Sequence, residues 1–179
     1  DDLVMYADAY YKHLSKEILI PASDDPDIIY IHALDKEHLR ITIDRIDKGE
    51  VHRFYDRTIS DDETREVRLF GLSKKDTFHF TGDDHPSITI RLVGGGDEDI
   101  VVNEAWGLKI IAYDDEGGLS ITGNPIRSNL NDKPFNNTYD RTDWNLNRSF
   151  HFPLPAYYTD EGIGLSYNVW LLKHGFRSE

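Results

Sequence analysis

The sequence predicts a mainly β fold, with solenoid-like or roll-like stacked strands, one N-terminal helix and an extended C-terminal tail. Three observations support this prediction. Short β-rich runs alternate with Gly/Asp turns from residue 18 to residue 122, a strand–turn–strand unit recurs 23 residues later, and helical periodicity precedes both. The 179 residues suit one domain with appendages, which we place as a helix at 1–20, a repeat-containing β domain at 21–127, and a linker followed by a strand at 128–179.

The composition narrows the class of protein. With 39% hydrophobic and 30% charged residues, the chain is too apolar to be disordered and too polar for a helical membrane protein. The 33 acidic residues against 20 lysines and arginines give a formal net charge of −13, which opposes binding to nucleic acid. The absence of cysteine excludes disulfides, thiolate metal sites and cysteine nucleophiles. Because the sequence opens on two aspartates without an initiator methionine, we expect a segment of a longer polypeptide.

The first segment has the periodicity of a helix. Leu3, Ala7, Tyr10 and Leu14 fall on one helical face, and Pro21 closes the segment. Acidic residues stand at its start and basic residues near its end, which complements the helix dipole. We expect this apolar face to cover a neighbouring sheet; a surface for binding a partner is the alternative.

The middle of the chain contains an internal repeat. Residues 68–78 align with residues 91–101, and weaker copies begin at Ile18, which needs one extra residue, and at Lys109. Each copy is a strand, a Gly/Asp turn and a second strand. A period of this length is typical of a solenoid, so we expect the copies to stack in parallel around one shared core.

The turns of this repeat carry recurring aspartates and glycines. A carboxylate just before the second strand can accept turn N–H bonds that would otherwise be unpaired, and a glycine supplies a positive φ where the strand turns a corner. The predicted turn-capping residues are Asp27, Gly71, Asp76, Gly94, Gly95 and Asp99.

Calcium is an alternative role for these turns. Residues 94–101 match the calcium-roll pattern G-G-x-G-x-D-x-U except at Asp97, so Asp97 and Asp99 are the candidate ligands. The equivalent turn carries Lys74 and Lys75, which repel a cation. We therefore expect structural capping, with calcium as the one cofactor left open.

The sequence lacks the common catalytic motifs, so we do not predict an enzyme. It has no G-x-S-x-G elbow, no P-loop and no H-E-x-x-H pair. Residues 83–86 group two carboxylates with an imidazole, which is a loop tip or a small metal or acid–base cluster; we expect a loop tip. His32, His52 and His79 share no spacing.

The last fifty residues change character. Residues 128–143 are rich in Asn and Asp and predict a linker, and residues 150–156 alternate but contain Pro153 and Pro155, which restrict them to an edge strand or an extended strap. Residues 162–172 predict a strand of 11 residues, long enough to cross a membrane and also compatible with an ordinary half-buried strand. The membrane-strand candidates are Ile163, Leu165, Tyr167, Val169 and Leu171.

Three stretches together resemble a known arrangement. They are residues 54–72, residues 91–99, and the tail from Tyr139 through 162–165 to 174–177. This combination resembles the connector between the calcineurin-like metallophosphoesterase domain and the surface-antigen (BamA-type) outer-membrane barrel of Bacteroidota envelope proteins. The resemblance implies a non-catalytic spacer in the cell envelope, periplasmic or associated with the outer membrane, whose partners are the flanking domains of the same polypeptide and the barrel. Of the phosphoesterase motifs only D-x-H has a match, at residues 83–85, so no catalytic residue is carried over.

A second function class remains open. Trp106, Trp144, Tyr157 and Tyr158 could stack on sugar rings while acidic turns hold calcium. That combination predicts a calcium-dependent or carbohydrate-binding adhesion module.

Overall fold

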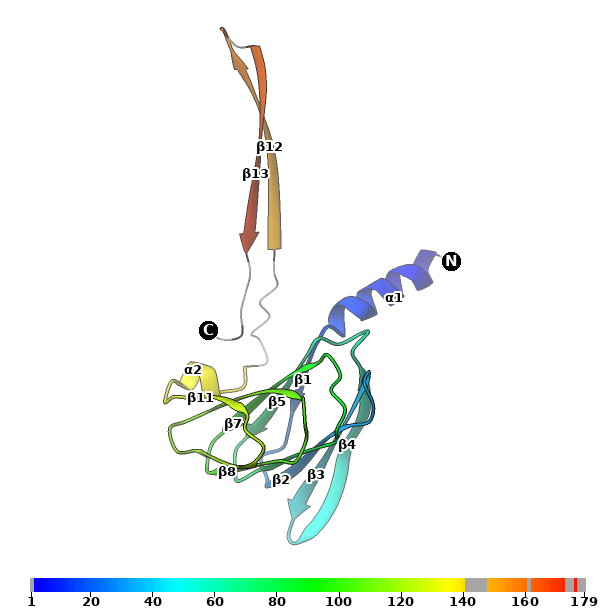
Figure 1. Cartoon of the computed structure of the whole chain (residues 1–179), viewed down its shortest axis with the longest axis vertical. Coiled ribbons are helices and arrows are strands. Elements are labelled where there is room, and N and C mark those ends of the chain that lie inside the picture. Colours follow the sequence, from blue (N-terminus) through cyan, green and yellow to red (C-terminus); the bar gives the residue numbers. More distant parts are fainter. Residues whose placement is uncertain (1, 141–147, 161, 173–175, 177–179) are drawn as a thin grey trace. The chain divides into compact units, whose positions relative to one another are not determined.

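The computed structural model describes residues 2–140, 148–160, 162–172 and 176 (Figure 1). The chain divides into two compact units, Asp1–Tyr139 and Asp140–Glu179, which are treated separately below. The predicted mainly β character with one N-terminal helix is confirmed, since 58% of the structure is strand and 9% is helix. Within the described ranges no sheet closes into a barrel. Neither described helix has the length and apolar character needed to cross a bilayer.

The first unit is built from two helices and eleven strands. In chain order they are α1 (Asp2–Leu14), β1 (Glu17–Pro21), β2 (Asp27–Ala33), β3 (His38–Asp47), β4 (Glu50–Ser60), β5 (Glu66–Leu72), β6 (Thr77–Thr81), β7 (Thr89–Gly95), β8 (Asp99–Asn103), β9 (Lys109–Asp114), β10 (Leu119–Gly123), β11 (Arg127–Leu130) and α2 (Pro134–Asn137).

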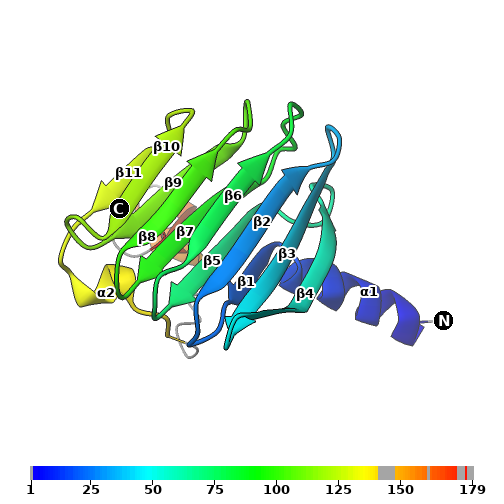
Figure 2. The ribbon, with the colours of Figure 1, turned by 90° about the horizontal axis from the view of Figure 1, so that it is seen from below.

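These strands form two sheets, and the chain passes from one to the other at successive corners (Figure 2). Sheet A has the order β1-β5-β7-β9-β11 and all its pairs are parallel. Sheet B has the order β10-β8-β6-β2-β3-β4; it is parallel from β10 to β2 and antiparallel from β2 to β4. The finer prediction of a solenoid or roll is not confirmed, because sheet B is mixed.

The repeat copies pair with one another in register. Arg68 lies opposite Arg91 in sheet A, and Phe78 lies opposite Val101 in sheet B. We call each pair of consecutive strands from sheet A and sheet B a coil: β1–β2, β5–β6, β7–β8 and β9–β10. The first coil needs no extra residue, because equivalent positions of the first two coils are 49 residues apart at both strands, as with Asp27 and Asp76. The hairpin β3–β4 accounts for the longer spacing.

The core lies between the two sheets. Inward-facing side chains alternate along each strand, as the twofold periodicity of strands requires. Phe78 and Phe80 of β6 and Ile90 and Leu92 of β7 are fully buried, and they belong to one cluster with residues of all four coils. Stacking the coils therefore removes one continuous apolar surface from water.

The N-terminal helix differs from the prediction in two ways. It ends at Leu14 rather than at residue 20, because residues 17–21 add the edge strand β1 to sheet A. The prediction that its apolar face covers a sheet is wrong, since α1 buries no residue and Leu3 is 79% exposed. The inner sheet faces already fill each other, and the outer face of sheet A carries charged groups such as Glu66 and Arg91.

In the second unit, the described residues form one hairpin. Strands β12 (Arg148–Tyr158) and β13 (Gly162–Leu172) pair antiparallel along their whole length, with Leu154 opposite Ser166. The predicted strand at 162–172 is confirmed with the same bounds. The proline-containing segment is its partner strand, as the edge-strand alternative predicted.

Candidate functional site

A column of buried carboxyl groups runs through the corner between the two sheets. The predicted turn residues Asp76 and Asp99 are fully buried, and Asp27 nearly so. Asp76 Oδ1 accepts a hydrogen bond from the backbone N–H of Asp27 at 2.8 Å, and Asp99 Oδ1 accepts one from the N–H of Asp76 at 2.8 Å. The carboxyl groups of Asp76 and Asp99 therefore accept hydrogen bonds from the backbone of the neighbouring coil rather than from their own turns.

The first member of the column has local partners. Asp27 accepts hydrogen bonds from the backbone N–H of Ser23 at 2.5 Å and from its hydroxyl at 3.0 Å. Burial raises the pKa of the Asp27 carboxyl, while the Ser23 hydrogen bonds and the Arg45 charge act in the opposite direction. This end of the column is hydrogen-bonded through both carboxylate oxygens.

The fourth member was missed by the sequence analysis. Asp114 ends β9, is fully buried, and accepts the backbone N–H of Asp115 at 2.7 Å through Oδ1. It follows Tyr113, which lies opposite Val93, so Asp114 stands where the preceding coil has Gly94. The sequence does carry a signal for Asp114. It is an acidic residue at the end of an apolar strand, at the position that glycine occupies in the two preceding copies. We call Asp27, Asp76, Asp99 and Asp114 the carboxyl column.

The glycines of the column have a different role from the one predicted. Gly71 and Gly94 are not among the residues with positive φ, so that prediction is wrong for both, whereas Gly95 has φ 109°. They are glycine because carboxyl groups fill the space of a side chain. A Cβ on Gly71 would meet Asp76 Oδ2 at 2.6 Å as well as the Gly94 carbonyl oxygen, and a Cβ on Gly94 would collide with Oδ2 atoms of the column.

The column is also electrostatically unusual. The Oδ2 atoms of Asp76, Asp99 and Asp114 are buried and have no hydrogen-bond partner. Burial raises the pKa of Asp76 to about 8, that of Asp99 to about 7 and that of Asp114 to about 6, because an ionised carboxylate loses its hydration there. These side chains are suited to holding protons rather than to performing acid–base chemistry on a substrate, since none of them reaches solvent.

The two candidate calcium ligands are separated by their environments. Asp99 is inside the corner, bonded to the backbone of Asp76, whereas Asp97 is exposed in the turn with φ 66°. Within the part of the chain that the structure describes, no group of three or more His, Asp or Glu side chains is placed to hold a metal ion. Calcium binding stays the alternative to structural capping.

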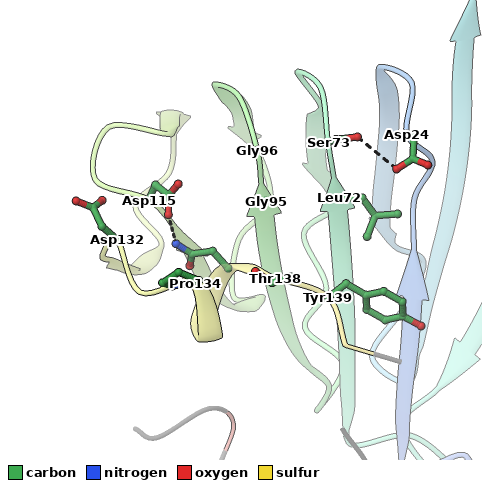
Figure 3. Close-up of a pocket in the computed structure, with 11 residues that line it drawn as sticks. Asp24, Leu72, Ser73, Gly95, Gly96, Asp115, Asp132, Pro134, Thr138 and Tyr139 are labelled. Carbon is green, nitrogen blue, oxygen red and sulfur yellow. Dashed lines mark hydrogen bonds between the residues drawn. The ribbon is translucent and has the colours of Figure 1, made fainter. Parts of the chain in front are cut away.

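A shallow groove lies beside the turns of sheet A (Figure 3). Its volume is about 460 Å³, and its lining residues are Asp24, Leu72, Ser73, Gly95, Gly96, Asp115, Asp132, Pro134, Asn137, Thr138 and Tyr139. Asn137 Nδ2 donates to Asp115 Oδ1 and to the Asn131 carbonyl, and the Ser73 hydroxyl donates to Asp24 at 3.3 Å. This lining contains no His, Lys or Arg, so it offers no cation for a phosphate, and the ionisable group beside the Ser73 hydroxyl is the carboxylate of Asp24.

The remaining polar candidates lie on loops and strand surfaces. Residues 83–86 occupy the loop between β6 and β7, as expected for a loop tip. His52 is exposed beside Glu50, and His32 Nδ1 lies 2.9 Å from the Thr81 hydroxyl. His79 packs against the ring of Tyr30. The structure does not bring these histidines together with a carboxylate pair.

The aromatic residues proposed for sugar stacking belong to both units of the chain. Trp106 is exposed in the first unit, Tyr157 and Tyr158 are exposed on the hairpin of the second, and Trp144 lies outside the described residues. The adhesion function stays a prediction.

The hairpin β12–β13 presents two exposed faces. All five membrane-strand candidates share one face and are exposed, from Val169 at 44% to Ile163 at 87%. The opposite face exposes the large side chains of Phe150, Phe152, Leu154, Tyr158 and Trp170. Residues 149–172 contain no lysine or arginine, and their two acidic residues are Asp160 and Glu161. Eleven residues span about 37 Å along an antiparallel strand.

Comparison with known proteins finds no relative. No protein-family model matches this sequence, and no curated protein and no solved structure matches it either. The resemblance to an envelope connector therefore stays a prediction from the sequence motifs.

Proposed function

We propose that this chain is a non-catalytic structural domain, a spacer between a soluble phosphoesterase domain and an outer-membrane barrel in the cell envelope. The observation that carries the proposal is the hairpin β12–β13, which is long, almost uncharged and exposed on both faces. Large exposed apolar surfaces mark sites of contact with a partner or a membrane. In a chain with net charge −13, this concentration of apolar side chains supports a dedicated attachment element.

The dimensions and edges of the hairpin favour insertion beside further strands. A strand of 9–11 residues, tilted by about 45°, matches the hydrocarbon thickness of a bilayer. A single hairpin leaves backbone groups unpaired at both edges, and lipid cannot satisfy them. Pro153 and Pro155 remove two N–H groups from β12, whereas β13 has no proline. The edge of β13 is therefore the better one for pairing with a next strand.

The first unit suits the role of a rigid spacer. Its coils are joined by parallel backbone ladders, by one apolar core and by the bonds of the carboxyl column. We infer that the parallel part works as a short solenoid-like stack, in which each coil is held mainly by its neighbours. Such a stack keeps the elements at its ends at a fixed separation.

The groove supports a non-catalytic role. Its carboxylates Asp24, Asp115 and Asp132 each accept a hydrogen bond from a protein group, and they repel phosphate. We expect no hydrolysis of a model phosphodiester by the purified chain with added manganese. Turnover that rises with protein concentration would overturn the spacer proposal.

The attachment role is tested with phosphatidylcholine vesicles, because neutral lipid avoids repulsion by the acidic chain. In a Trp106→Phe, Trp144→Phe background the emission of Trp170 is expected to shift to shorter wavelength when vesicles are added. Leu165→Arg should abolish the shift, because it places a charge on the lipid-facing strand. Ile121→Arg is the matched control on an exposed strand of the first unit, and should leave the shift intact. An emission spectrum that vesicles do not alter would refute the attachment role.

A further inference from the structure

At three members of the carboxyl column, the negative charge of an ionised carboxylate would have no hydrogen-bond donor at one of its two oxygens. Asp76, Asp99 and Asp114 are fully buried, and each has one oxygen without a hydrogen-bond partner. The glycines beside them leave no gap, because even one added methyl group on Gly71 or Gly94 would overlap a carboxyl oxygen. An isolated buried carboxylate is strongly disfavoured, and in practice it takes up a proton instead.

We propose that the carboxyl column is a pH-sensitive element of the stack: the coils close firmly when Asp76, Asp99 and Asp114 carry protons, and they loosen when these side chains ionise.

The geometry provides places for the protons. Asp76 Oδ2 and the Gly94 carbonyl oxygen both lie against the same side of Gly71, so a protonated Asp76 has an acceptor of the next coil beside it. The Oδ2 atoms of Asp99 and Asp114 both lie against Gly94. Two carboxyl groups that converge in this way cannot both ionise without strong repulsion, so at least one holds a proton.

The charges around the column favour protonation as well. Asp76 faces Asp27 and Asp99, and Asp114 faces Asp115. Asp99 faces Asp97, Asp114 and the cation Lys75. At the end of the column, Asp27 faces Asp25 and the cation Arg45. Carboxylates therefore outnumber these two cations around the column.

The direction of the pH effect follows from proton linkage. Because the folded pKa of each of the three side chains is raised above the ordinary 3.8, the native chain binds more protons than the unfolded chain. The stability that they contribute is complete below the unfolded pKa, falls as pH rises, and is lost by the time pH passes about 8. The steepest loss is expected between about pH 4 and pH 6, where the unfolded chain has released these protons and the native chain still holds all three, and the loss levels off toward pH 8.

The test is urea unfolding of the full chain at pH 5.5 and pH 8.5. We expect the midpoint to fall at pH 8.5 by on the order of 1 M urea. The triple variant Asp76→Asn, Asp99→Asn, Asp114→Asn keeps the Oδ1 acceptors but cannot ionise, and its midpoint should change little between the two pH values. Asp97→Asn, in an exposed part of the same turn, is the matched control and should keep the wild-type dependence. A wild-type midpoint that does not fall, or an equal fall in the triple variant, would overturn the proposal.

Asp27 and His38 also have raised pKa values and act with the same sign, and His38, which lies outside the column, needs its own control. The pKa of His38 is raised by its hydrogen bond to Asp35, so that exposed pair also loses stabilisation as pH increases. His38→Gln removes this contribution and should leave most of the fall in place.

A second measurement covers the case in which the triple variant does not fold. Carbon-13 shifts of the aspartate side-chain carboxyls in the wild-type chain report protonation directly. Three carboxyls with titration midpoints above pH 5.5 are expected, whereas midpoints below 4.5 for all aspartates would overturn the proposal.

Discussion

Gly94 is the position where the packing of the carboxyl column can be tested most sharply. Replacing it with alanine places a Cβ against the Oδ2 atoms of Asp99 and Asp114. Relieving such overlap typically costs about 1–3 kcal/mol. If Asp99 moves, the hydrogen bond from the N–H of Asp76 is also lost, at about 1 kcal/mol or more. We therefore expect Gly94→Ala to lower the free energy of unfolding by about 3 kcal/mol, a large share of the stability of a typical domain.

Gly96 gives a control two residues away on the same turn. A Cβ there has only the Leu72 carbonyl oxygen within 4 Å, at 3.9 Å, so Gly96→Ala should change the free energy of unfolding by no more than about 0.5 kcal/mol. Both variants are measured by urea unfolding at pH 5.5, where the column carries protons. If the two alanine variants unfold at the same urea concentration, the side-chain space at Gly94 is not filled as described.

Three further predictions concern the core, the groove and calcium. Phe78→Ala should destabilise the chain by about 3–5 kcal/mol because Phe78 is fully buried, whereas Tyr6→Ala on α1 should stay within about 0.5 kcal/mol; equal thermal shifts would contradict the burial. Asn137→Ala should cost about 1–2 kcal/mol in urea unfolding, because Asp115 and a backbone carbonyl lose a donor; an unchanged midpoint would show that these bonds add nothing. Millimolar calcium should leave the thermal midpoint unchanged, and a rise of several degrees would support the adhesion module instead.

The repeat shows why part of this fold can be predicted from the sequence. Copies spaced by 23 residues can stack only if equivalent residues are neighbours, so the pairing of Arg68 with Arg91 follows from the alignment. The strand at 162–172 is similarly local in origin. In each case the information lies within a short stretch or in a comparison of two copies.

The parts that sequence analysis missed depend on contacts between distant residues. The apolar stripe of α1 predicts that something covers it, but not that the sheets already cover each other. Gly71 was assigned a turn conformation because the sequence cannot show that the side chain of Asp76 fills its empty space. Asp114 was missed because, in the last coil, the buried carboxyl group belongs to the end of the first strand, β9. In the coils before it, this group stands at the start of the second strand.

The hairpin β3–β4 has a consequence for how this architecture can vary in length. It covers the edge of β2 that faces away from β6 with antiparallel strands, so the parallel stacking in sheet B runs only from β2 toward β10. A duplicated coil inserted after β8 would pair in the same backbone register with the coil on each side of it. It would add about 4.8 Å to the stack. Insertion of gene segments that each encode one whole coil would therefore lengthen the stack in equal increments. The elements at its two ends would stay unchanged.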